Sequence, residues 1–512
     1  MPSLIKSVST VGANTMLSRV LGFVRDLVFA HVFGANANTD AFFVAFKIPN
    51  FLRRLFAEGA FATAFVPVLT EYKTTREFSD LKTFVDHVAG TLGLILLVVT
   101  FIGVVGAPVL VMLFAPGFMD EPEKQLLTTD MLRLTFPYIL FISLTAFAGG
   151  VMNAHGKFGI PAFTPVLLNL VLIASALWLA PMMDQPIIAL AWGVLIAGIT
   201  QFVFQLPFLN KLKLLPRFTV APKDEGVRRI GKLMLPALFG VSVTQINLLL
   251  DTLLASFLVS GSISWLYYSD RLMEFPQGIL AVAIGTVVLP GLSKKHAEKS
   301  PKAFSHMIDW GLRWIILFGI PAAVGLLMLA GPMIATLFQS AVFDAHDVEM
   351  AQLSLWAYSL GLLPFMLIKV LAPGYYARQD TKTPVRIAII AMVSNMVLNL
   401  ILIFPLQHAG LALATSLAAM LNAFLLYRGL RKDSIYKPEQ GWIWLLSRIA
   451  ASALIMAILI FWLKPDFSFW LEAERLSKIV WLLGLIGAGG AVYFIMLYVF
   501  GVRFTHFRNR PV

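Results

Sequence analysis

The sequence predicts an all-α integral membrane protein with fourteen transmembrane helices. Of its 512 residues, 58% are hydrophobic and only 13% are charged, whereas soluble domains carry about 25% charged residues. No hydrophilic stretch is long enough for a separate soluble domain. Apolar segments, each close to the roughly 20 residues that a spanning helix needs, lie near residues 8–30, 41–70, 84–114, 131–152, 159–180, 187–209, 233–258, 265–292, 311–337, 351–373, 384–404, 409–427, 442–463 and 480–502.

The charges in the loops predict the orientation of these segments. When alternate loops are counted together, one set and the two chain ends hold 27 cations, and the other set holds 4. Cytoplasmic loops of membrane proteins are rich in lysine and arginine. The opposite set contains two acidic loops, 115–130 and 338–350. Both termini are therefore predicted to face the cytoplasm.

The composition and the absence of motifs exclude several classes of function. The chain has no cysteine, which excludes a disulfide scaffold and a cysteine-based metal site. The net charge of +12 lies mostly in short loops, so it indicates topology rather than nucleic-acid binding. Neither a zinc-protease helix motif, a P-loop nor a Gly-x-Ser-x-Gly elbow occurs. The sequence therefore favours a transporter without a cofactor over an enzyme.

Several features recur at a constant spacing of 223 residues, which indicates an internal duplication. Pro161 corresponds to Pro384, each at the start of a segment, and residues 189–191 (ALA) correspond to 412–414 (ALA). The spacing covers six segments, so both halves have the same orientation, as in transporters whose halves rock about a central site. The predicted parts are an N-lobe over 1–222, a C-lobe over 223–437, and two further helices with a tail over 438–512.

Seven cations lie inside the apolar segments and away from their ends. Facing lipid, each would cost about 3 kcal/mol, so they are expected to face the protein interior or a watery cavity. Arginine's planar fork suits bidentate phosphate binding, and the set therefore predicts a chamber for a phosphorylated substrate. The seven cations are Arg19, Arg25, Lys47, Arg53, Arg54, Arg271 and Lys369.

Carboxylates accompany these cations at helical spacing. Arg19 and Asp26 are close to two turns apart, and so are Asp40 and Lys47; Glu58 follows Arg54 by four residues, and Asp270 and Glu274 flank Arg271. The alternative interpretation is a set of internal ion pairs that hold the fold together. Charge alone leaves open a nucleotide, a sugar phosphate or a lipid pyrophosphate.

Four other polar residues lie inside the apolar segments and are candidates for an ion-coupling site. Asn395, Asn399 and Thr415 have interhelical hydrogen bonding as their alternative role. Asp251 lies in the middle of its segment without an obvious partner.

Four strings of sequence resemble the MurJ (MviN) family of lipid II flippases. They are SRVLGFVRD at 18–26, TDAFFVAFK at 39–47 with PNFLRR at 49–54 and AEG at 57–59, YSDRLMEFP at 268–276, and KVLAPGYY at 369–376 with DTKTP at 380–384. The resemblance implies membership of the multidrug, oligosaccharidyl-lipid and polysaccharide exporter superfamily. It also implies a bacterial inner-membrane protein with two six-helix lobes around a central cationic cavity and two C-terminal helices.

The resemblance further implies that the chain flips undecaprenyl-pyrophosphate-linked peptidoglycan precursor, lipid II, to the periplasmic leaflet for cell-wall synthesis. Arg19, Arg25, Arg53 and Arg271 would contact the pyrophosphate and the nearby headgroup, and the last two helices would take the undecaprenyl tail. The supporting cavity residues would be Ser18, Asp26, Asp40, Lys47, Arg54, Glu58, Ser264, Asp270, Glu274 and Lys369.

The energy source for transport, the binding partners and the alternative functions are the remaining expectations. Coupling to Na⁺, H⁺ or the membrane potential stays open. The expected partners are lipid II, membrane lipids and cell-wall synthesis or division proteins, and no nucleic acid. The alternative function is a related exporter of another undecaprenyl-linked glycan or of drugs, although a cation exporter would need a carboxylate-lined cavity. A scaffold without transport activity would not need seven buried cations.

Overall fold

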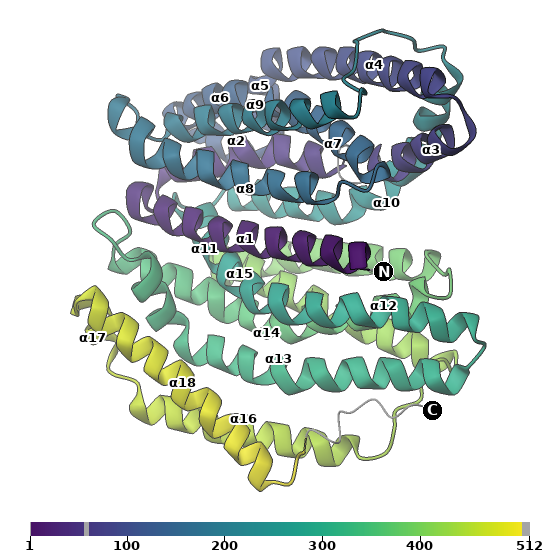
Figure 1. Cartoon of the computed structure of the whole chain (residues 1–512). Helices are drawn as coiled ribbons and strands as arrows, with labels where there is room; N and C mark the ends of the chain where they lie inside the picture. Colours follow the sequence, from purple (N-terminus) through teal and green to yellow (C-terminus); the bar gives the residue numbers. More distant parts are fainter. Residues whose placement is uncertain (1, 56–60, 504–512) are drawn as a thin grey trace. The chain divides into compact units, whose positions relative to one another are not determined.

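The computed structural model describes residues 2–55 and 61–503, and every regular element in these residues is a helix (Figure 1). Contacts between helices group the chain into two compact units, Met1–Ser264 and Trp265–Val512. The first unit holds α1 (Pro2–Phe33), α2 (Ala37–Arg53), α3 (Ala62–Thr75), α4 (Phe78–Val105), α5 (Ala107–Phe114), α6 (Pro122–Thr135), α7 (Tyr138–Ala154), α8 (Gly159–Ala174), α9 (Ile188–Lys211) and α10 (Glu225–Ala255), with the short turns η2 (Pro116–Asp120), η3 (Ser175–Leu179) and η4 (Ala180–Met182).

The second unit continues from α11 (Ser262–Pro276), a helix that crosses the boundary between the units. It holds η5 (Gln277–Ala281), α12 (Val282–Ala297), α13 (Pro301–Phe338), α14 (Ala345–Tyr376), α15 (Lys382–Lys432), α16 (Trp442–Leu463), α17 (Phe467–Glu472) and α18 (Arg475–Val499). Within this unit α14 packs between α13 and α15, and α16 packs against α13 and α18. In the first unit α1 packs against α8, and α7 packs against α9.

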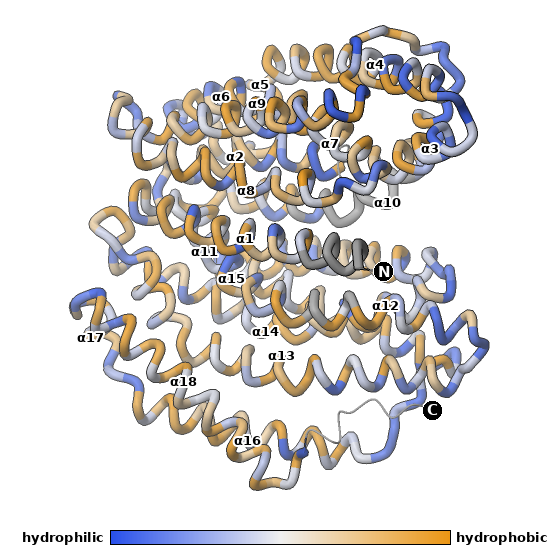
Figure 2. Tube along the Cα trace, in the orientation of Figure 1, coloured by the Kyte–Doolittle hydropathy of each residue, from blue (hydrophilic) through white to orange (hydrophobic). Residues whose placement is uncertain are grey.

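The helices have the length and composition of membrane spans. Among the described residues, nine helical stretches are long and apolar enough to cross a bilayer. Figure 2 shows hydrophobic residues along most of α13, α16 and α18, and hydrophilic residues gathered toward the connecting loops. Each apolar segment of the sequence overlaps one or more of the helices. The expected total of fourteen spans remains a prediction.

Several of the expected spans correspond to more than one helix, and one long helix is bent back on itself. The apolar segment 41–70 corresponds to two helices, α2 and α3, and Pro49 lies inside α2. In α15, Gln407 has a non-helical backbone with φ 49°. The Asn395 side-chain amide donates to Thr415 Oγ1 at 3.3 Å, which a continuous helix would separate by about 30 Å. α15 is therefore a hairpin of two antiparallel arms.

An irregular segment lies along α4. Residues 214–221, here called the strap, follow α9 and form no regular element. The Arg217 amide donates to Asp86 Oδ1 at 2.7 Å, and the Ala221 amide donates to Thr91 Oγ1 at 3.0 Å. A Cβ built on Gly90 would lie 2.3 Å from the Thr219 carbonyl oxygen. The strap therefore lies against α4 at a position where only glycine leaves room for its backbone.

Asp309 fixes the loop between α15 and α16 to the first turns of α13. Its Oδ1 accepts hydrogen bonds from the Tyr436 hydroxyl and the Trp442 indole, both at 2.7 Å, and Arg313 Nε donates to its Oδ2 at 2.6 Å. Burial and the hydrogen bond to Asp309 raise the pKa of Tyr436, so this phenol stays protonated. The start of α16 is thus attached to α13 by a buried polar network as well as by packing between the two helices.

Candidate functional site

Arg25 and Asp26 form a buried ion pair where α1 packs against α8. Arg25 Nε and Nη2 both donate to Asp26 Oδ1, at 3.0 and 2.7 Å, and Nη1 donates to Asn169 Oδ1 at 3.1 Å. The Asn169 amide donates in turn to the Ser18 carbonyl oxygen at 3.0 Å. Arg25 is 9% exposed and Asp26 is 1% exposed. The guanidinium is therefore oriented by three hydrogen bonds before any ligand arrives.

Arg19 has a different environment, at one end of a pocket of about 430 Å³. The pocket lies within the first unit, and α1 contributes Val11, Thr15, Ser18 and Arg19 to one wall. These positions share one helix face. Among the described residues, no hydrogen bond or ion pair of the Arg19 side chain occurs. Its guanidinium is exposed and so can reach a ligand.

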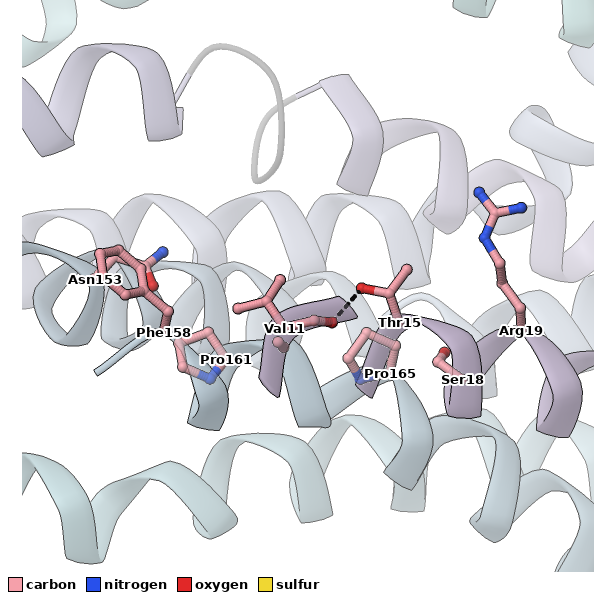
Figure 3. A pocket seen from close by; sticks show the side chains of 9 residues that line it. Val11, Thr15, Ser18, Arg19, Asn153, Phe158, Pro161 and Pro165 are labelled. Carbon is pink, nitrogen blue, oxygen red and sulfur yellow. Dashed lines mark hydrogen bonds between the residues drawn. The ribbon is translucent and has the colours of Figure 1, made fainter. Parts of the chain in front are cut away.

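The opposite wall of this pocket comes from the end of α7 and the start of α8. Asn153 and Phe158 lie at the end of the pocket away from Arg19 (Figure 3). Between this end and Arg19, the Thr15 hydroxyl donates to the Val11 carbonyl oxygen at 2.8 Å. Asn153 and Phe158 were not among the residues expected from the sequence. A lone aromatic next to a loop gives no sequence signal of a site.

The three cations of the second expected span lie on α2 or at its end, and all are half-buried. Arg53 Nε donates to Asn50 Oδ1 at 2.8 Å, within the last turn of the helix. Arg54 directly follows α2 as its C-cap, and Lys47 lies about two turns earlier. Glu58, the expected partner of Arg54, lies outside the described residues. The i+4 pairing of Arg54 with Glu58 therefore remains a prediction.

Asp40, at the start of α2, accepts hydrogen bonds from the start of α11. The Gly261 amide donates to Asp40 Oδ2 at 2.7 Å, and the Ser264 amide and hydroxyl donate to Oδ1 at 2.8 and 2.6 Å. Lys124 Nζ lies 3.9 Å from Oδ2, and Lys124 is itself buried. A carboxylate at a helix N-terminus is stabilised by the free amides and the helix dipole. The Asp40 carboxylate on α2 thus binds the N-terminus of α11 through Ser264.

In the second unit, Arg271 is oriented by its neighbours on α11. Its Nη1 donates to Glu274 Oε2 at 2.6 Å, and its guanidinium carbon lies 4.8 Å from the centre of the Tyr267 ring. Asp270 is half-buried on the same turn, and Lys369 is exposed on α14. The spacing of Arg271 and Glu274 in the sequence already indicated this local pair.

The amides expected as candidates for ion coupling connect the two arms of α15. Asn399 Nδ2 donates to Asn395 Oδ1 at 2.9 Å, Asn395 donates to Thr415, and Thr415 Oγ1 donates to the Leu411 carbonyl oxygen at 3.0 Å. This is the interhelical hydrogen bonding named as their alternative role. Asp251 is half-buried near the end of α10. Within residues 2–55 and 61–503, no cluster of three or more His, Asp or Glu side chains could hold a metal ion.

Besides Asn153 and Phe158, sequence reasoning missed two further neighbours of the expected residues. Asn169 orients Arg25 although 144 residues separate them, and the one signal was a lone amide inside an apolar segment. Lys124 was counted as a loop cation, yet its side chain is 3% exposed, bonded to Ser260 and close to Asp40. The structure places Lys124 in the first turn of α6 with its side chain buried, and composition alone does not distinguish such a lysine from a solvent-exposed one.

Comparison with known proteins gives full-length matches. A family described as "Lipid II flippase MurJ" matches residues 29–479. A probable lipid II flippase MurJ from Vibrio cholerae serotype O1 is 50% identical over 507 residues, which cover 98% of this chain and 97% of the relative. The lipid II flippase MurJ of Burkholderia cenocepacia is 43% identical over 513 residues, which cover 99% of each.

Solved structures show the same fold. A lipid II flippase MurJ in an inward closed conformation superposes with a TM-score of 0.82 at 30% identity, covering 96% of this chain and 98% of that chain. An inward-facing multidrug resistance MATE family transporter of the MOP superfamily gives a TM-score of 0.66 at 13% identity, covering 83% and 98%. The second likeness concerns the fold alone.

Proposed function

Since this chain belongs to the lipid II flippase MurJ family, we propose that it moves lipid II from the cytoplasmic to the periplasmic leaflet for cell-wall synthesis. It is a multi-pass integral membrane protein with an all-helical fold, and it is a transporter rather than an enzyme. The observation that carries the proposal is a family match over most of the chain together with arginines on α1, α2 and α11 that suit a pyrophosphate.

In the proposed architecture, fourteen spans form two six-helix lobes around a central cationic cavity, with two C-terminal helices beside them. The 223-residue repeat supports this arrangement, because both repeats then have the same orientation. The 27-to-4 distribution of loop cations supports cytoplasmic termini. Transport proceeds by alternating access, with the cavity open first to the cytoplasm and then to the periplasm.

Arg19, Arg25, Arg53 and Arg271 hold the pyrophosphate and the adjacent headgroup in this proposal. The chemical support is that guanidinium groups pair with phosphate oxygens through two parallel hydrogen bonds. Three of the four are already oriented by a neighbour, at Asp26 with Asn169, at Asn50 and at Glu274. Preorganisation of this kind lowers the entropy that ligand binding costs. Arg19 supplies a guanidinium that stays available for the ligand.

Resetting of the empty carrier draws on an ion gradient or on the membrane potential. Moving one net charge through the full field is worth about 2.3 kcal/mol per 100 mV, and an empty cationic cavity carries several charges. Asp251 is the remaining candidate for ion coupling. Because Asn395, Asn399 and Thr415 already bond to one another, we assign them to helix packing.

Depletion of the protein tests the proposed function directly. With the chromosomal copy under a repressible promoter, the fraction of lipid II that an external lipid II-cleaving colicin can reach should fall during depletion, while total lipid II rises. Wild-type protein supplied in trans should restore the accessible fraction, and the Arg19→Ala variant, expressed to the same level, should not. An unchanged accessible fraction after depletion would rule out the proposed function.

A further inference from the structure

The pocket that begins at Arg19 continues for about two helical turns beyond it. From Arg19 back to Val11 the helix rises by about 12 Å, and Asn153 and Phe158 line the far end. We propose that this pocket is a subsite for the sugar part of the substrate headgroup. The inference rests on the proposed function, because it takes a pyrophosphate at Arg19 as its starting point.

The covalent structure of the substrate determines what lies next to Arg19. In lipid II the first sugar is bonded directly to the pyrophosphate, so a phosphate held by Arg19 places that sugar within the neighbouring turn of α1. Thr15 and Ser18 lie on that turn and carry the hydroxyls nearest to Arg19 in the pocket (Figure 3). The volume of about 430 Å³ lies within the range of sites for small ligands.

The chemistry of the lining favours carbohydrate over the peptide part of the headgroup. Among the lining residues that the structure describes, Arg19 is the one charged side chain, and the others combine an aromatic ring, apolar side chains and uncharged polar groups. Sugars present apolar C–H faces to aromatic rings and hydroxyls to amides, and both partners are present in Phe158 and Asn153. A peptide stem with free carboxylates would need further cations, and the described part of the lining offers none besides Arg19.

The walls are held in register before any ligand binds. The Asn14 amide donates to the Gly159 carbonyl oxygen at 3.0 Å, and the Asn169 amide donates to the Ser18 carbonyl oxygen at 3.0 Å. Both bonds join α1 to the helix that carries Pro161 and Pro165. The distance between the two walls is therefore set by the fold, as a specificity subsite requires.

Binding of two ligands to the purified full-length protein separates this subsite from the phosphate site. The ligands are lipid II and undecaprenyl pyrophosphate, which has the same lipid and phosphates but no sugar. We expect Phe158→Leu and Asn153→Ala each to weaken lipid II binding by about five- to tenfold and to leave undecaprenyl pyrophosphate binding within about twofold. Phe158→Tyr keeps the ring and should retain wild-type selectivity.

Two further variants serve as controls. Arg19→Ala should weaken both ligands, because both contain the pyrophosphate. Leu170→Ala removes an exposed apolar side chain on the face of α8 opposite Pro161 and should change neither. If Phe158→Leu weakens the binding of both ligands, or if Phe158→Leu and Asn153→Ala keep the wild-type preference for lipid II over undecaprenyl pyrophosphate, the subsite is overturned. The flippase proposal is unaffected by either result. Failure of the wild-type protein to bind either ligand overturns both.

Discussion

Arg19 and Arg25 lie on the same helix and have the same chemistry, but their surroundings give them different roles. Arg25 is buried and donates three hydrogen bonds to Asp26 and Asn169. Arg19 is exposed at the pocket. We infer that Arg25 also contributes to the packing of α1 on α8, whereas Arg19 contributes to the ligand alone.

The two alanine variants should therefore differ in stability although both lose transport. Arg25→Ala leaves the buried Asp26 without this partner, a change that costs about 3–5 kcal/mol in buried pairs. Arg19→Ala should change stability by less than about 0.5 kcal/mol. Thermal unfolding of the purified variants measures the difference in stability. Growth with each variant as the sole copy measures the loss of transport. Equal unfolding midpoints would contradict the distinction.

Asp40 gives a second prediction for a single residue. Asp40→Ala removes the acceptor for the Gly261 and Ser264 amides, and each buried amide left without an acceptor costs about 1–3 kcal/mol. We expect a clear fall in the unfolding midpoint and loss of growth support.

Asp130→Ala is the matched control for Asp40→Ala. Asp130 pairs with Arg133 at 3.1 Å, but both side chains are about half exposed, and such pairs contribute about 0–1 kcal/mol. If Asp130→Ala lowers stability as much as Asp40→Ala does, the buried hydrogen bonds of Asp40 are not what stabilises this part of the fold.

Local pairs in the site could be predicted from the sequence, and distant ones could not. Arg271 and Glu274 are three residues apart, so helix geometry alone brings them together. Asn169 is 144 residues from Arg25, and Gly261 is 221 residues from Asp40. No periodicity in one helix shows which other helix lies against it, and these partners required the tertiary structure.

At the scale of elements, the strap requires a glycine at position 90 of α4, although glycine is a poor helix former. Gly90→Ala places a Cβ 2.3 Å from the Thr219 carbonyl oxygen, and overpacking of this kind costs about 1–3 kcal/mol. Gly231→Ala is the matched control, because a Cβ at this glycine of α10 meets nothing within 4 Å. There we expect a gain of about 0.5–1 kcal/mol from the better helix former.

Unfolding midpoints of the two glycine variants test the contact between the strap and α4. A lower unfolding midpoint for Gly90→Ala together with a higher one for Gly231→Ala supports a strap fixed against the helix. A gain in stability for Gly90→Ala would show that the strap is free to move away.

The apolar segments predicted the helices well, because a bilayer-spanning helix needs a long uninterrupted run. Irregular features were harder. Pro49 does not end α2, which continues to Arg53, and the strap, LLPRFTVA at 214–221, carries no sequence signal of its contact with α4. The turn at Gln407 lies between the expected segments 384–404 and 409–427.

At the scale of the whole molecule, the orientation can be tested by chemical labelling. The chain contains no cysteine, so each introduced thiol reports on one position. Asp120→Cys and Asp344→Cys should react with an impermeant maleimide in intact spheroplasts, and Lys223→Cys should react only after lysis. All three side chains are exposed in their own units. Labelling of Lys223→Cys in sealed cells would reverse the proposed orientation.

The hairpin of α15 has a consequence for how the chain reaches the bilayer during synthesis. Between Arg386 and Arg428 there is no lysine, arginine, aspartate or glutamate, and the tip carries Phe404, which is 85% exposed. Translocating a tip without charge carries little desolvation cost, while the cations at both ends remain behind. The two arms can therefore enter the membrane as one inserted unit, joined by the hydrogen bond between Asn395 and Thr415.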